Sequence, residues 1–149
     1  MTHLTTRGSW LALLVLGACS YAPSPGPVPQ GNPDSLLLGR FEDDYGNLFT
    51  ITGELWTQHP GARYHIVRWR SEAQYLIARN DPRNPGEGGL WSRIDWMPLT
   101  GMPPFGWAFC MSAYRAASAA EAESAAVARR DTPRNGCNGH PFSRMKPAR

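Results

Sequence analysis

The sequence lacks the motifs that mark most enzymes and nucleotide-binding proteins. It contains no GxSxG, GxGxxG or P-loop pattern, so nucleophile-elbow, dinucleotide and nucleoside-triphosphate sites are not predicted. The formal net charge is only +3, and no basic cluster interleaves with aromatic residues, so we expect no nucleic-acid partner. No residue stands out as catalytic, and we therefore expect a protein that is not an enzyme.

Metal-binding spacing is also missing. The 4 histidines form no HxH or HxxxH pair, and the cysteines are not clustered at zinc-ligand spacing. One loop does gather oxygen-bearing side chains, namely Asn80, Asp81, Asn84 and Glu87. Their spacing does not match an EF-hand, and Asn and Asp are favoured in turns for local hydrogen bonding. We expect turn chemistry here rather than calcium binding, and neither a metal nor a cofactor.

No apolar run is long enough to span a bilayer, yet a short one lies near the start. Arg7 is followed by the apolar stretch Trp10–Leu16 and then by Gly17, Ala18 and Cys19. This run falls far short of the roughly 20 residues that a membrane-spanning helix needs. A basic residue, a short apolar core and small residues are typical of an export signal. We therefore interpret residues 1–18 as a signal peptide.

The segment Leu16-Gly17-Ala18-Cys19 resembles the lipobox of bacterial lipoproteins. The resemblance implies cleavage before Cys19, a diacylglyceryl thioether on its sulfur and acylation of the new amine. Two or three acyl chains together anchor a protein stably, whereas one holds only reversibly. In Gram-negative lipoproteins, an Asp directly after the lipid-bearing Cys resembles an inner-membrane retention signal. This sequence has Ser20 at that position, so we expect the outer membrane rather than the inner one. The alternative is an ordinary secretory signal in which Cys19 is incidental.

Only two cysteines remain after Cys19, namely Cys110 and Cys137. In the oxidising cell envelope an isolated pair of cysteines indicates a disulfide. With two thiols only one pairing exists. We therefore predict a Cys110–Cys137 disulfide that holds the C-terminal tail against the preceding structure.

The chain after the signal divides into a spacer and one domain. Residues 19–34 are rich in Pro, Gly and Ser, which favour extended conformations over helix, and we interpret them as a tether. Residues 35–149 are of single-domain length. Six segments with strand character are separated by turn signals, which predicts a six-stranded antiparallel meander or small barrel. The predicted strands are Leu36–Glu42, Leu48–Gln58, Arg63–Arg70, Ala73–Arg79, Leu90–Met97 and Phe105–Tyr114.

The last predicted strand and the segment after it give the sharpest pattern. Phe105, Trp107, Phe109, Met111 and Ala113 share one face by the two-residue period, and smaller residues occupy the other. We expect the bulky face to enter the core and the small face to accept another element closely. The alanine-rich segment Ala116–Arg130, with a Ser118-Ala-Ala-Glu121 capping box, predicts one C-terminal helix as that element.

One strand carries a candidate ligand face. Trp91, Arg93 and Asp95 lie on the same side of their strand. If this side lines a barrel interior, Trp and Arg together suit an anionic or aromatic ligand. If it faces water, Arg93 and Asp95 form exposed ion pairs of small energy, and we favour this second interpretation.

Our functional hypothesis is a lipid-anchored envelope protein with a non-catalytic binding or structural role. Its partner would be an envelope protein or a glycan. Five tryptophans lie in predicted strands, and we expect them to fill the core; the alternative is a partly exposed aromatic surface that binds this partner. The alternative is a lipocalin-like small barrel that carries an apolar or anionic ligand. The segment Gly39-Arg40-Phe41 faintly resembles a lipocalin first strand, and the outline is similar to envelope barrels such as lysozyme inhibitors. Similarity of architecture does not determine function.

Overall fold

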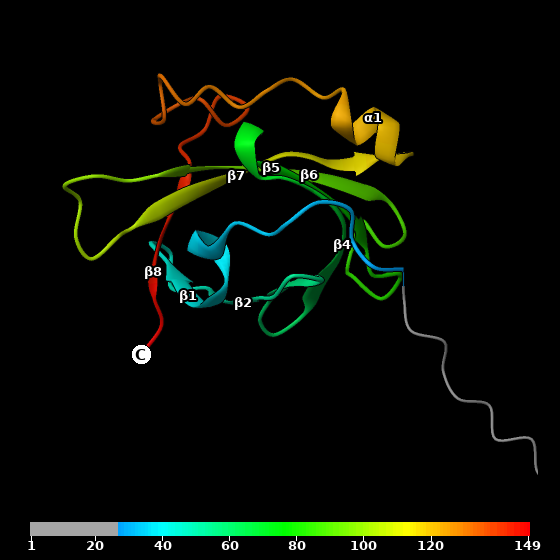
Figure 1. Ribbon diagram of the computed structural model, residues 1–149, viewed down its shortest axis with the longest axis horizontal. Coiled ribbons are helices and arrows are strands. Elements are labelled where there is room, and N and C mark those ends of the chain that lie inside the picture. The colour runs from blue at the N-terminus through cyan, green and yellow to red at the C-terminus, as the bar shows by residue number, and fades with distance from the viewer. Residues whose placement is uncertain (1–26) are drawn as a thin grey trace, which may run out of the picture.

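A computed structural model describes residues 27–149, which fold into a closed antiparallel barrel of eight strands (Figure 1). Each strand pairs with its neighbours in sequence, and the last strand pairs with the first, so the sheet is continuous around the barrel. The predicted β-rich antiparallel fold is confirmed, in its barrel form. The strands are β1 (Gly39–Asp43), β2 (Leu48–Ile51), β3 (Leu55–Gln58), β4 (Ala62–Arg70), β5 (Tyr75–Asn80), β6 (Trp91–Pro98), β7 (Trp107–Ala116) and β8 (Ser143–Pro147).

The barrel has eight strands rather than the predicted six for two reasons. The predicted strand Leu48–Gln58 is a hairpin, because the hydroxyl of Thr52 accepts hydrogen bonds from the backbone N–H groups of Glu54 and Leu55 and turns the chain. The tail lacks a clear period in sequence, yet it forms β8. That strand lies between β1 and β7 and closes the sheet.

The predicted helix is present but much shorter than expected. It spans α1 (Ala119–Glu123) instead of Ala116–Arg130. The capping box forms, since Ser118 Oγ accepts from the Glu121 N–H at 3.1 Å and the Glu121 carboxylate accepts from the Ala117 N–H at 3.0 Å. After α1 the chain runs across the barrel wall, where Arg130 donates to the Trp96 carbonyl at 2.8 Å. The helix propensity of the alanines stabilises a segment of this length only weakly. Contacts with the barrel therefore decide the conformation of the residues after α1.

The barrel interior is filled by large apolar side chains. Four tryptophans are almost completely buried, and many of the aromatic rings meet edge to face. Trp69 donates its indole N–H to the Gly53 carbonyl at 2.8 Å, whereas the Trp107 N–H has no acceptor among the described residues. The interior cluster comprises Leu37, Phe41, Phe49, Ile51, Trp56, Tyr64, Ile66, Trp69, Leu76, Ala78, Ile94, Trp96, Trp107, Phe109 and Met145.

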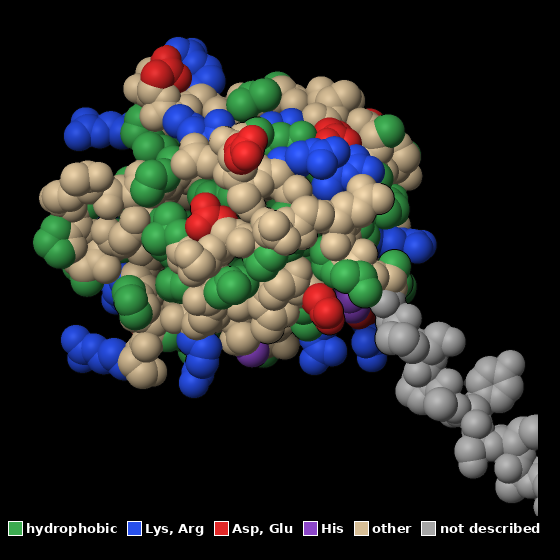
Figure 2. Space-filling model, in the orientation of Figure 1, with side chains coloured by type: hydrophobic (Ala, Val, Ile, Leu, Met, Phe, Trp, Pro, Cys, Tyr) green, Lys and Arg blue, Asp and Glu red, His purple; other side chains and the backbone are tan. Residues whose placement is uncertain are grey.

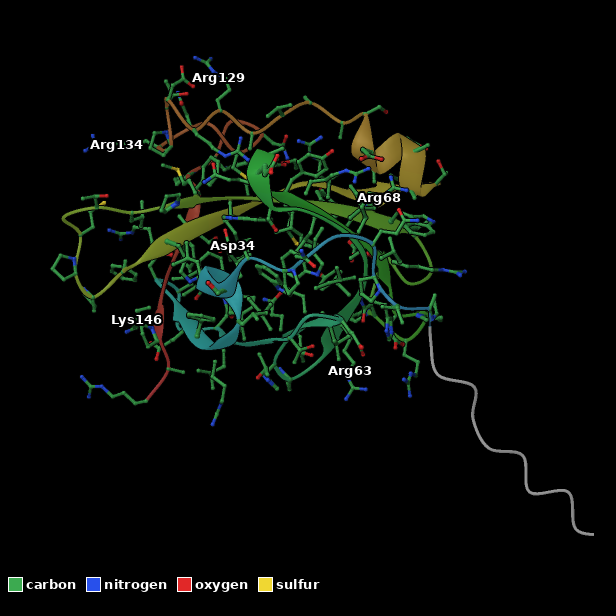
Figure 3. The ribbon with its side chains drawn as sticks, in the orientation of Figure 1. Asp34, Arg63, Arg68, Arg129, Arg134 and Lys146 are labelled. Atoms are coloured by element: carbon green, nitrogen blue, oxygen red, sulfur yellow. A yellow bond between two sulfur atoms is a disulfide. The ribbon has the colours of Figure 1, made fainter. Side chains whose placement is uncertain are left out.

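One end of the barrel is plugged by the segment before β1. The short 3-10 helix η1 (Ser35–Leu37) places Leu37 in the interior cluster, where it is completely buried. Asp34, labelled in Figure 3, accepts from the Leu36 N–H at 3.0 Å and from the Trp96 indole N–H at 3.3 Å. Gln30 pairs with β4 through the Val67 carbonyl and the Trp69 N–H. The last residues of the predicted tether 19–34 are therefore part of the barrel, while residues 1–26, including Cys19, lie outside the described residues.

The predicted disulfide is confirmed and secures the tail. Cys110 points outward from β7 and bonds to Cys137, with 5.4 Å between the Cα atoms. Trp107 and Phe109 point inward, as the two-residue period predicts, and Met111 packs against the same cluster. Phe105 and Ala113 do not belong to it, because β7 begins only at Trp107 and its pairing with β6 shifts register beyond Met111. The small outward face of β7 does accept other elements: Ala108 and Cys110 pack against the tail with Ala128 and Phe142, whereas α1 packs only at the end of β7, near Ala116.

We expect loss of the disulfide to lower stability by about 3 kcal/mol, because the unfolded chain regains the entropy of an open loop. The bond closes a sequence separation of 27 residues. Reductant should lower the denaturation midpoint of the wild-type chain and leave that of the Cys110→Ser/Cys137→Ser variant unchanged. Equal responses of the two proteins would contradict this prediction.

Candidate functional site

The end opposite the plug carries the connections β1–β2, β3–β4, β5–β6 and β7–β8, and we call it the mouth. Polar side chains replace apolar ones in the interior at this end. Asn80 and Ser92 are completely buried and hydrogen-bonded to each other at 2.7 Å. Asn80 also donates to the carbonyls of Glu87 and Tyr114 at 3.0 and 3.1 Å, which holds the β5–β6 loop over this part of the mouth.

A hollow of about 550 Å³ opens on the other side of the mouth, because β7 is twice as long as β8. The register between them runs from Trp107 to Phe109, so the far half of β7 has no strand partner on its β8 side. A tight turn, Cys137–His140, lies beside β7 in place of a strand. We name this space the rim hollow. Its lining residues are Asp43, Tyr45, Asn47, Phe49, Gln58, Phe109, Cys110, Met111, Tyr114, Cys137, Asn138, His140 and Ser143.

The charge of the rim hollow is low. Neither lysine nor arginine is among its lining residues, and Asp43 is the one acidic group. The Asp43 carboxylate is nearly buried and already bound by its own turn. It accepts from the N–H groups of Tyr45 and Asn47 at 2.9 and 2.8 Å and from the Asn47 side-chain amide at 2.9 Å. The hollow therefore offers amides, hydroxyls, rings and the His140 imidazole, but neither Lys nor Arg to neutralise an anionic ligand.

The turn beside the rim hollow is held by local geometry. Cys137 and His140 exchange backbone hydrogen bonds at 2.9 and 2.8 Å around Asn138 and Gly139, which both have positive φ. Asn-Gly is the preferred pair for such a two-residue turn. The Asn138 amide donates to the Met111 and Ser112 carbonyls at 3.3 and 3.4 Å, so turn and strand are joined.

The candidate ligand face of Trp91, Arg93 and Asp95 lies elsewhere, on the outer wall of the barrel. It neither lines the interior nor faces water, because α1 and the chain after it cover it. Arg93 and Asp95 form a buried bidentate pair, at 2.9 and 3.0 Å. Trp91 is half-buried beside them and packs in the cluster under α1. The expectation of an exposed ion pair is therefore wrong, since sequence period does not show what covers an outer face.

The buried Arg93–Asp95 pair joins several elements. Asp95 also accepts from Ser112 and from Arg130 at 3.1 Å. Arg93 donates to the Glu123 carbonyl at 2.8 Å and stacks over the Tyr75 ring at 4.0 Å. With its donors and acceptors occupied, this network binds the β7–β8 connection to the barrel rather than a ligand.

Glu123 is the acidic end of the same network. Basic side chains gather beneath α1 in Figure 2, and Figure 3 shows Arg68 in this region. The Glu123 carboxylate accepts from Arg68, from the Tyr75 hydroxyl at 3.0 Å and from Arg70 at 3.4 Å. Burial acts to raise the pKa of Glu123, but the Tyr75 hydrogen bond and the two arginines together lower it.

The oxygen-rich loop after β5 shows turn chemistry at Asp81, but other side chains in it bind strands that are distant in sequence. The Asn84 amide bonds both backbone groups of Arg63, at 2.8 and 2.7 Å. Asp81 accepts from the backbone and guanidinium of Arg83 and contacts His65 at 3.0 Å. The hydrogen bonds from Arg83 and then His65 hold the pKa of Asp81 well below its ordinary value. Within residues 27–149 no group of His, Cys, Asp and Glu is arranged to hold a metal ion.

Sequence reasoning missed the rim hollow. The Asn138–Gly139 pair is a strong hairpin signal that marks the turn beside the rim hollow, whereas nothing in the sequence marks Tyr45 and Asn47 as lining residues. None of the helices in residues 27–149 is long and apolar enough to cross a bilayer.

No protein-family model, no curated protein and no solved structure matches the chain.

Replacing Asp95 with Ala should destabilise the fold by about 3–5 kcal/mol, because Arg93 would remain buried without its carboxylate. The matched control is Asp131→Ala, which removes an exposed pair with Arg129 and should change stability far less. Chemical denaturation measures both values. Similar losses of unfolding free energy in the two variants would contradict the prediction that the buried pair matters more to stability than the exposed one.

The lowered pKa of Glu123 gives a pH dependence with a definite sign. The stabilisation is complete above the ordinary glutamate value near 4.5 and is lost as the pH falls through the lower folded-state value. Between pH 7 and pH 3 the melting temperature should therefore fall less in Glu123→Gln than in the wild-type chain. The control Glu72→Gln, at an exposed position, should follow the wild type, and equal slopes for all three proteins would refute the assignment.

Proposed function

We propose that this protein is a lipid-anchored, non-catalytic binding protein of the cell envelope that engages its partner at the mouth of the barrel. The observation that carries the proposal is the contrast between the two regions of the barrel. The interior is filled by an aromatic and aliphatic cluster that includes four fully buried tryptophans. The rim hollow, in contrast, is open and lined by groups that can bind.

This contrast counts against the lipocalin-like alternative. A carrier of apolar molecules needs an internal cavity, but Trp56, Trp107 and Phe109 are packed against one another where such a ligand would lie. An anionic ligand at the mouth would find no Lys or Arg among the residues lining the rim hollow. A binding site on the rim of a solid barrel agrees better with both observations.

The anchor part of the proposal depends on Cys19 and on the position of the first barrel contact. Gln30 is already paired with β4. The chain from Cys19 to Gln30 can span at most about 40 Å even when fully extended. A lipid on Cys19 would thus keep the barrel close to the membrane surface, and we place it in the outer membrane of the envelope.

Native mass spectrometry of the full-length chain, extracted from membranes with detergent, tests both parts of the proposal. We expect a mature chain that begins at Cys19, carries two or three acyl chains and holds no further small molecule. Cys19→Ala should lack the acyl mass and leave the membrane fraction, whereas the control Ser20→Ala should retain both. An unmodified wild-type Cys19 would refute the anchor, and a stoichiometric apolar molecule released on unfolding would refute the solid barrel.

A further inference from the structure

We propose that the rim hollow binds a neutral oligosaccharide. This inference rests on the proposed function, since it names the partner chemistry of the same site. Sugars present apolar C–H faces together with many hydroxyl groups and carry no charge. A site for them therefore needs exposed rings for stacking and uncharged hydrogen-bonding groups in the same space.

Exposed aromatic rings border the rim hollow from two separate elements. The β1–β2 turn supplies Tyr45, which is 70% exposed, and β7 supplies Tyr114, which is 45% exposed. Tyrosine offers a large, rigid contact surface with a polar tip and loses little conformational entropy on binding. Arg115 lies over the Tyr114 ring, at 5.5 Å from its centroid, and Tyr114 nevertheless remains 45% exposed.

Uncharged polar groups complete the lining. Asn138 uses its amide nitrogen for the two β7 carbonyls, so its oxygen remains as an acceptor. Gln58, at the mouth end of β3, forms no side-chain hydrogen bond with another residue in the described part of the chain, and its amide can both donate and accept. Ser143 adds a hydroxyl at the start of β8. Below them Phe49 and Met111 provide an apolar floor.

The size and charge of the hollow agree with this ligand class. A volume of about 550 Å³ lies within the roughly 300–1,000 Å³ typical of small-ligand sites. The Asp43 carboxylate is already bound by Tyr45 and Asn47, so it offers little to a cation. An extended peptide is the competing class, because the far half of β7 lacks a strand partner on its β8 side. The Asn138 amide already bonds two carbonyls of that segment, which favours the sugar.

The test is a calorimetric titration of the full-length chain with chitotetraose and with maltotetraose. The protein is kept in a zwitterionic detergent, because sugar-headed detergents would compete for the site. We expect saturable binding of at least one oligosaccharide. Tyr45→Ala and Tyr114→Ala should each weaken it about tenfold, the loss expected for one stacking contact. Tyr45→Phe should retain affinity within about threefold, because the ring is preserved.

The matched control is Met102→Ala, which removes an exposed apolar side chain in the β6–β7 loop at the plugged end. It should leave the affinity unchanged. Tyr45 and Tyr114 are exposed, so their variants should keep the wild-type melting temperature, which separates loss of binding from loss of fold. We expect even a weak site to approach saturation at an oligosaccharide concentration of about 10 mM. If neither oligosaccharide shows saturable binding at that concentration, the proposal is overturned.

Two further outcomes would also overturn it. One is saturable binding of inorganic phosphate that the tyrosine variants abolish, and the other is binding of an uncharged pentapeptide library in place of the sugars. Neither outcome affects the acyl mass on Cys19 or the solid interior. The proposal of a lipid-anchored binding protein and the proposal of sugar binding are therefore tested by separate measurements.

Discussion

The structure depends on one closing interaction, the insertion of β8 between β1 and β7. An open sheet would leave two edges with unpaired backbone groups, and closure removes them. β8 comes from the end of the chain, after a connection that begins beyond Ala116. The Cys110–Cys137 disulfide holds this connection on β7 just before β8 begins. The pairing of β8 with β7 covers only Trp107 to Phe109, because β8 is short, and the rim hollow lies beside the rest of β7.

The aromatic interior explains why binding is placed at the rim. Eight strands enclose a space that side chains can fill, and here four tryptophans do so together with Leu37 from the plug. Close packing of this kind leaves no room for a ligand without displacing large rings. Toward the mouth, the buried polar side chains of Asn80 and Ser92 hold the β5–β6 loop. The interior therefore supports the rim and fixes the positions of its loops.

The charged network on the outer wall has a structural role that its composition does not reveal. Burying Asp95 is unfavourable unless its charge is compensated, and Arg93, Arg130 and Ser112 all donate to it. Because these donors come from three separate segments, the network orders the long β7–β8 connection. That order in turn delivers the tail to the position in which β8 can pair. A candidate ligand face is thus occupied by the protein's own chain.

The sequence by itself determined the features that depend on neighbours along the chain. These are the β class, the inward face of β7, the Ser118–Glu121 cap and the single disulfide pairing. It could not determine β8 or the length of α1, because both depend on contacts between segments far apart in sequence. The two-residue period placed Arg93 and Asp95 on one face, but only the tertiary structure decided that the face is outside and covered. The rim hollow is likewise a feature that only the tertiary structure decided, since it results from the unequal lengths of two strands that meet only in the folded barrel.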